Sequence, residues 1–160
     1  MKVKFMATTG IIAALYIAVT MLVAPFGFTE VQFRISEIFN HLVAFNPRFS
    51  IGIILGVFIA NMFSPLGLYD LIFGVAHSII TISIFVLICK FVKNIMVRLV
   101  LNTLLFTFTM FIIAFELNLA LELPFFWTWL TVAAGEFVVL AVGAPIMYLL
   151  NNRLNFKNLI

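Results

Sequence analysis

Long, uninterrupted runs of apolar residues constrain this chain more than any other feature. They recur from Thr8–Ala24 to Phe125–Leu150, and 65% of the 160 residues are hydrophobic while only 9% are charged. A soluble domain of this size leaves too much of its chain at the surface to hide so much apolar area. Within a bilayer only helices and closed barrels satisfy every backbone amide, and continuous rather than alternating runs favour helices. The sequence therefore predicts an all-α integral membrane protein.

Six hydrophobic segments, separated by proline, glycine and polar residues, are expected to form helices. Pro25 and Gly27 end the first, which we interpret as a retained helix because it is longer than a signal-peptide core and lacks a good cleavage site. The second and third are shorter than the roughly 20 residues of a full crossing, so we expect them to be tilted or embedded. Residues 1–160 contain no linker or repeat and are expected to form one membrane domain. The predicted helices are Thr8–Ala24, Ser36–Phe45 with Ser36 as its N-cap, Phe49–Phe63, Tyr69–Phe91, Ile95–Leu117 and Phe125–Leu150.

Basic residues concentrate on one side of this arrangement. Six crossings place eight of the nine lysines and arginines on the side of both termini, and no acid joins them. By the positive-inside rule this side is cytoplasmic, so we expect a multi-pass protein with both termini inside the cell. The bias also explains the net charge of +3 without a nucleic-acid partner. The basic set is Lys2, Lys4, Arg48, Lys90, Lys93, Arg98, Arg153 and Lys157, and the opposite side receives Glu30, Arg34, Glu37, Asp70, Glu116 and Glu122.

The stretch Val31–Pro47, VQFRISEIFNHLVAFNP, is unusually polar for this chain. Arg34, Glu37 and His41 follow an i, i+3, i+7 spacing that predicts one shared helical face, with Asn40 on an adjacent face. Ionisable residues at membrane depth are costly and usually mark function. Two interpretations remain open for Arg34: an ion pair with Glu37 near the headgroups, or a place in a binding pocket. For Glu37 and Asn40 the pocket is favoured.

A second polar stripe is predicted on the fourth helix. Asp70, Gly74, His77 and Thr81 recur at helical spacing, and Gly74 leaves room beside the polar groups. Asp70 is interpreted first as a cap of the helix start. His77 is a binding candidate, although a lone core histidine is commonly just hydrogen-bonded. Asn61, with Ser64, adds polar groups at the outer end of the third helix.

Helix six places an acid deep within an apolar segment. Glu136 lies seven residues after Trp129 and thus on nearly the same face. Either Glu136 bonds to Asn61 or His77 in another helix, or it binds a ligand, which is the interpretation we favour. Trp127 fits an interfacial aromatic belt, and Trp129 fits either the belt or the pocket. Together the polar groups predict a small pocket for a flat, hydrogen-bonding ligand, either neutral or cationic.

Small residues recur at every fourth position of the first helix, at Gly10, Ala14 and Ala18. Such a stripe lets another helix approach closely. It serves either packing against the chain's own helices or docking to a separate membrane subunit. The single cysteine, Cys89, and the absence of Cys/His metal spacings and of hydrolase or phosphate-loop motifs give no reason to expect a metal, a cofactor or an enzyme.

The segment VQFRISEIFNHL, followed by GIILGVFIANMFSPLGLYDLIFG, resembles the queuosine-precursor transporter (QueT) family. Its members are substrate-binding S components of energy-coupling factor (ECF) importers of the bacterial plasma membrane. The resemblance implies a six-helix S-component fold with cytoplasmic termini, and a ligand that enters from outside under the loop between helices one and two. It also implies docking of Ala14 and Ala18 to a transmembrane coupling subunit, with ATP hydrolysis in two partner subunits.

The ligand implied by the resemblance is a 7-deazaguanine precursor of queuosine, with the aminomethyl form expected. We assign Glu37 and Glu136 to the ring and ammonium contacts, in either order. Trp129 or a phenylalanine is expected to stack on the ring. Rival functions are an S component for another vitamin or nucleobase, a small membrane enzyme, or a structural membrane subunit. The further candidate residues are Arg34, Asn40, Asn61, Asp70 and His77.

Overall fold

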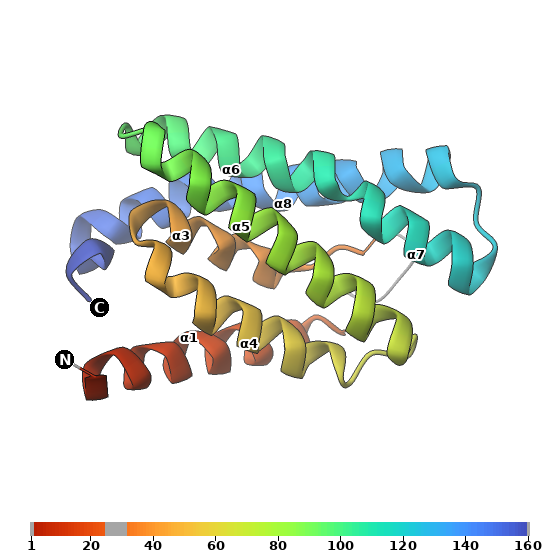
Figure 1. The fold of residues 1–160 in the computed structure, drawn as a ribbon, viewed down its shortest axis with the longest axis horizontal. Helices are drawn as coiled ribbons and strands as arrows, with labels where there is room; N and C mark the ends of the chain where they lie inside the picture. The colour runs from red at the N-terminus through yellow and green to blue at the C-terminus, as the bar shows by residue number, and fades with distance from the viewer. Residues whose placement is uncertain (1, 25–31, 160) are drawn as a thin grey trace.

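The computed structural model describes residues 2–24 and 32–159. Within these ranges the chain forms helices and short connections and no strand (Figure 1). Six helical segments follow one another, as the sequence predicts. In chain order the elements are α1 (Lys2–Leu22), η1 (Ile35–His41), α3 (Leu42–Phe45), η2 (Pro47–Phe49), α4 (Ser50–Asn61), η3 (Asp70–Gly74), α5 (Val75–Phe91), α6 (Ile95–Thr109), α7 (Phe111–Leu121), α8 (Phe125–Leu154) and η4 (Phe156–Asn158).

Four of the six segments in the described ranges are long and apolar enough to cross a membrane: α1, η3 with α5, α6 with α7, and α8. The segments Ile35–Phe45 and Pro47–Asn61 are shorter, which confirms the expectation for the second and third helices. The first helix begins at Lys2, six residues earlier than predicted, and the last continues to Leu154. Apolarity alone therefore locates the segments, while polar helix ends shift their boundaries.

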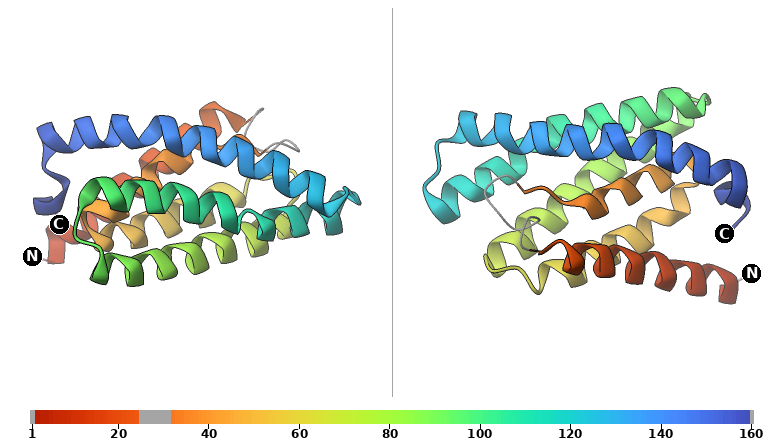
Figure 2. Two further views of the ribbon diagram at one scale, coloured as in Figure 1. Left: turned by 90° about the horizontal axis from the view of Figure 1, so that it is seen from above. Right: turned by 180° about the vertical axis from the view of Figure 1, so that it is seen from behind.

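The short segment η1–α3 lies inside the bundle. It contacts α1, α4, α6 and α8, and Figure 2 shows it between the long helices α1 and α8. Leu42, Val43 and Ala44 are at most 1% exposed. Because its neighbours shield it from lipid on all these sides, a short helix with polar side chains is tolerated at this depth.

Helix α1 packs mainly against α4, through glycines of α4. A Cβ at Gly52 would lie 2.9 Å from the carbonyl oxygen of Thr9, and one at Gly56 would lie 2.7 Å from Cβ of Tyr16. Both distances are too short for a side chain, so the two glycines permit the close approach of the helices. The buried face of α1 is the one that carries Ile12 and Tyr16.

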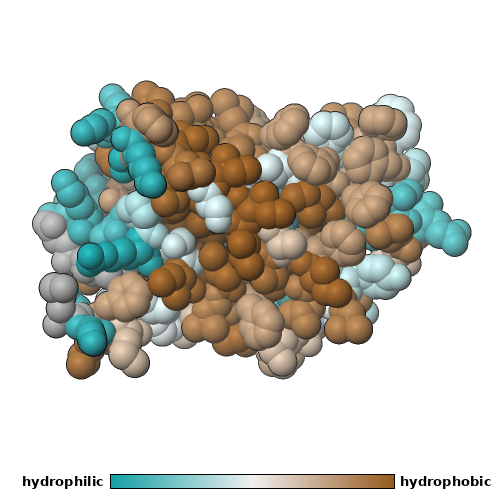
Figure 3. All heavy atoms as spheres, viewed as in Figure 1, coloured by the Kyte–Doolittle hydropathy of each residue, from teal (hydrophilic) through white to brown (hydrophobic). Residues whose placement is uncertain are grey.

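Both termini lie at the same end of the bundle, together with the η2 segment and the α5–α6 connection (Figure 1). These are the segments that carry the predicted basic set. On the face drawn in Figure 3, a broad hydrophobic band separates hydrophilic ends. Large apolar side chains such as Ile72, Phe108 and Val142 are more than half exposed, as expected for surfaces that contact lipid. Glu30, Pro25 and Gly27, and with them the connection between α1 and η1, lie outside the described residues.

Candidate functional site

Three irregular stretches of helix surround one polar hollow. They are the 3₁₀ segment η1, the π-helical turn η3, and the break at Met110 between α6 and α7. Irregular turns within helices are frequent at functional sites. The hollow has a volume of about 10 Å³, the scale that admits one water molecule. Its lining residues are Gln32, Arg34, Glu37, Gly74, His77, Met110, Ile113 and Glu136.

Arg34 is the centre of a buried network. Its Nη2 donates to Oδ1 of Asp70 at 2.6 Å, its Nη1 to Oδ1 of Asn61 at 3.2 Å, and its Nε to Oε1 of Gln32 at 2.8 Å. Ser64 donates to Oδ2 of Asp70, and Nδ2 of Asn61 donates to the Asp70 carbonyl oxygen at 2.9 Å. The ion pair proposed between Arg34 and Glu37 is thus replaced by one between Arg34 and Asp70.

The capping role expected of Asp70 is wrong, because its carboxylate faces Arg34 and Ser64 and makes no helix-capping bond. Gly74 makes space for this network, as predicted. A Cβ at Gly74 would collide with the amide nitrogen of Asn61 and lie 3.5 Å from Nη1 of Arg34. Gly74 of the fourth predicted helix therefore lets Asn61 of the third predicted helix and Arg34 come close to it.

Glu37 is bound to the first helix. The hydroxyl of Tyr16 donates to Oε1 of Glu37 at 2.5 Å, and the amide of Asn40 donates to Oε2. Beside this pair, Thr20 donates to the hydroxyl of Ser36 at 2.7 Å, and Ser36 does not act as the predicted N-cap. Sequence analysis missed Tyr16, whose available signal was a polar group four residues before Thr20 on one face of an apolar helix.

Two buried acids have carboxyl oxygens that accept no hydrogen bond from a donor group in the described residues. Glu136 is 2% exposed and its Oε1 accepts no hydrogen bond from the described residues. Its proposed bonds to Asn61 or His77 do not form there: Asn61 is held by Arg34 and Asp70, and Nε2 of His77 lies 3.0 Å from Oγ1 of Thr109. Glu116 is fully buried and neither of its carboxyl oxygens has a described partner. The sequence analysis had counted Glu116 only among the charges of the outer side.

His41 does not share the face of Arg34 and Glu37 at the hollow. Asn102 Nδ2 lies 3.2 Å from Nδ1 of His41, and Nε2 lies 2.9 Å from the carbonyl oxygen of Leu140, to which it donates. The cause is the 3₁₀ geometry of η1. At about 3.0 residues per turn, the four positions from Glu37 to His41 rotate a side chain by about a third of a turn beyond one full turn. His41 therefore fixes η1 to α6 and α8.

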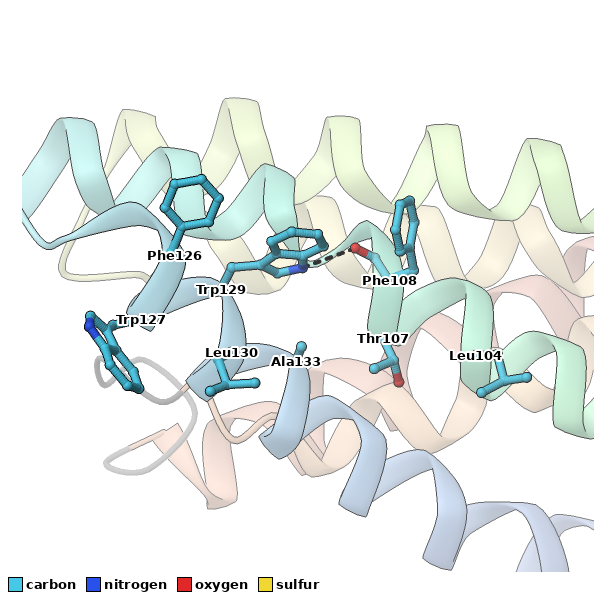
Figure 4. A pocket seen from close by; sticks show the side chains of 8 residues that line it. All are labelled: Leu104, Thr107, Phe108, Phe126, Trp127, Trp129, Leu130 and Ala133. Atoms are coloured by element: carbon cyan, nitrogen blue, oxygen red, sulfur yellow. Dashed lines mark hydrogen bonds between the residues drawn. The ribbon is translucent and has the colours of Figure 1, made fainter.

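Trp129 does not line the polar hollow. Its indole nitrogen donates to the carbonyl oxygen of Phe108 at 3.2 Å (Figure 4). It lines an apolar surface groove of about 750 Å³ between α6 and α8, together with Phe108, Phe126 and Trp127. Trp127 is 71% exposed, as expected of a belt residue. The stacking partner proposed for a ligand is thus not found at the hollow in this arrangement.

The small-residue stripe of α1 faces outward. Gly10, Ala14 and Ala18 are exposed, and a Cβ at Gly10 would meet nothing within 4 Å. The chain's own packing uses the other face, with Ile12 and Tyr16 against α4. Of the two interpretations of the stripe, internal packing therefore finds no support among the described helices.

Comparison with known proteins identifies the family. Residues 6–152 match the family described as QueT transporter. The chain is 34% identical over 165 residues to the queuosine precursor transporter QueT of Lactococcus lactis subsp. cremoris (strain MG1363), an alignment that covers 98% of this chain and 97% of that protein. No solved structure matches. Two agreeing matches over nearly the whole chain establish that it belongs to the QueT transporter family.

Proposed function

We propose that this chain is the substrate-binding S component of an ECF-type importer and that its ligand is the aminomethyl form of 7-deazaguanine. Family membership supports transport of a queuosine precursor. The single observation that carries the finer assignment is an excess of hydrogen-bond acceptors over donors in the buried polar centre. The proposed ligand offers ring N–H groups, an exocyclic amine and an ammonium group, which are all donors.

Within the described residues, the excess of hydrogen-bond acceptors can be traced to individual atoms. Four buried oxygens of the polar centre lack a donor: Oδ1 of Asn40, both carboxyl oxygens of Glu116, and Oε1 of Glu136. The buried nitrogen that lacks an acceptor near them is Nε2 of Gln32. Leaving a buried acceptor unpaired costs about 1–3 kcal/mol, more for a charged group. A donor-rich ligand relieves several of these costs at once, and the ammonium group of the aminomethyl form adds three N–H donors that the cyano form lacks.

The arrangement described here is closed. A hollow of about 10 Å³ is too small for a bicyclic base, so binding requires the lining side chains to separate. Gln32 and Arg34 precede η1 in the chain and line the hollow. We propose that the ligand enters there, from outside the cell, as the resemblance implies.

The basic end of the bundle is assigned to the cytoplasm by the positive-inside rule, which places both termini inside. The exposed stripe Gly10, Ala14 and Ala18 then faces lipid and is proposed to dock to the transmembrane coupling subunit. Two partner ATPase subunits supply the energy, in keeping with the absence of a phosphate-loop motif from this sequence.

A calorimetric titration of the detergent-purified protein tests the proposal. We expect binding of aminomethyl-deazaguanine and weaker binding of the cyano form, guanine, thiamin and pyridoxine. Glu136→Gln and Glu37→Gln are expected to weaken binding, while Glu122→Gln, which changes an exposed acid, serves as the control. Absence of binding, or preference for thiamin or pyridoxine, would reject this ligand assignment.

A further inference from the structure

Glu116 is a fully buried acid beside the polar hollow. It lies on the buried face of α7 with Ile113, which lines the hollow. Three residues separate the two, a rise of about 4.5 Å along the helix. Glu116 is 0% exposed, and within the described ranges neither of its carboxyl oxygens receives a hydrogen bond. It therefore extends the wall of the hollow by one turn.

Neighbouring charges do not explain its presence. Glu116 lies near Asp70 and Arg34. Asp70 already receives Nη2 of Arg34 on one oxygen and Ser64 on the other. The guanidinium donates to Asp70, and Glu116 is a second acid beside this pair, so the three side chains contain two acids and one base. A buried carboxyl group in such a setting is costly, and an acid retained at membrane depth generally serves function.

The other acids of the centre differ from Glu116. Glu37 receives hydrogen bonds from Tyr16 and Asn40, so it is held by the protein itself. Glu136 lines the hollow directly and is placed to accept N–H groups of a ring that occupies it. Glu116 does not line the hollow itself and lies one helical turn along α7 from Ile113, which does.

We propose that Glu116 is a specificity-determining residue that accepts the positively charged aminomethyl arm of the ligand, while Glu136 accepts from the ring. The inference rests on the proposed function and sharpens it. Glu116 selects the charged arm over the neutral cyano group because a charge-assisted hydrogen bond forms only with the former. The assignment leaves Glu37 as a positioning residue that α1 holds in place.

The test compares two ligands on four proteins. Dissociation constants for aminomethyl-deazaguanine and cyano-deazaguanine are measured for the parent, Glu116→Gln, Glu116→Asp and Glu122→Gln. In Glu116→Gln the aminomethyl ligand is expected to bind about tenfold to a hundredfold more weakly, the range of a lost charge-assisted bond, while the cyano ligand changes little. Glu116→Asp keeps the charge but withdraws it by one methylene, so an intermediate loss for the aminomethyl ligand is expected. Glu122→Gln should behave as the parent does.

Equal losses for both ligands, or no loss for either, would overturn the role of Glu116. If Glu116→Gln does not fold, the Glu116→Asp protein decides, because an unchanged ratio of the two dissociation constants contradicts the inference. Failure of the parent protein to bind either ligand has a different meaning. It rejects the proposed function itself.

Discussion

The Tyr16 hydroxyl donates a 2.5 Å hydrogen bond to Glu37 and so joins the first helix to the polar centre. The same helix exposes Ala14 and Ala18 on its other face. A single rigid element therefore contacts a candidate binding residue on one side and carries the candidate docking stripe on the other. We expect a movement of Glu37 on opening of the hollow to pull on α1 through this bond.

Removing the hydroxyl tests the importance of this bond. In Tyr16→Phe, Glu37 loses one of its two donors in a buried position. We expect the free energy of unfolding to fall by about 1–2 kcal/mol and ligand affinity to weaken by about threefold to tenfold. Thermal unfolding and calorimetric titration in detergent measure the two effects. Tyr148→Phe, in the half-buried later part of α8, is the control, and identical behaviour of the two variants would contradict the prediction.

The close α1–α4 contact predicts that replacing Gly56 of α4 by alanine lowers the stability of the protein. In Gly56→Ala the new Cβ would lie 2.7 Å from Cβ of Tyr16, so the helices must separate. We expect a loss of about 1–3 kcal/mol, the usual cost of overpacking. Gly10→Ala is the matched control, since a Cβ there meets nothing within 4 Å and alanine favours the helix. If Gly56→Ala unfolds at the same temperature as Gly10→Ala, the close approach of the two helices is wrong.

Much of this fold is predictable because its signals are local. Apolar runs and their proline, glycine and polar boundaries locate all six helical segments within a few residues. The rule that acids and amides at membrane depth gather inside the bundle also succeeds. Arg34, Glu37, His77 and Glu136, taken from three predicted helices, line one hollow.

The pairings were not predictable, because they depend on how helices pack and on irregular turns. His41 points away from Glu37 because η1 is a 3₁₀ segment. Asp70 pairs with Arg34 through a π-helical turn that apolar periodicity does not reveal. Trp129 lies at an apolar surface groove because it is about two helical turns away from Glu136 along α8, at a height where α8 packs beside Phe108 instead of the hollow. Glu116 became a candidate only once its burial without a partner was visible.

The Arg34–Asp70 ion pair predicts strong coupling between the two residues. Removing one partner leaves the other charge buried, so Arg34→Ala and Asp70→Ala are each expected to cost about 3–5 kcal/mol. The double variant should cost less than the sum, with an interaction energy of up to about 3 kcal/mol. Unfolding of the four proteins in the same detergent gives this cycle. Strict additivity would show that the 2.6 Å contact contributes nothing to stability.

Substitutions in the outward stripe on α1 can distinguish an effect on docking from an effect on ligand binding. Ala14 and Ala18 are exposed on the side opposite Tyr16, so Ala14→Leu and Ala18→Leu should leave the fold and the dissociation constant of the ligand unchanged. A bulky side chain blocks close helix approach, and uptake by cells that contain the coupling subunits is expected to fall at least about tenfold, equivalent to roughly 1.4 kcal/mol of lost docking. Ala141→Leu, at an exposed alanine of α8, controls for added bulk in the membrane. Normal uptake by both stripe variants would exclude this face as the docking surface. Loss of ligand binding together with loss of uptake would show that the stripe supports the binding site and not a partner.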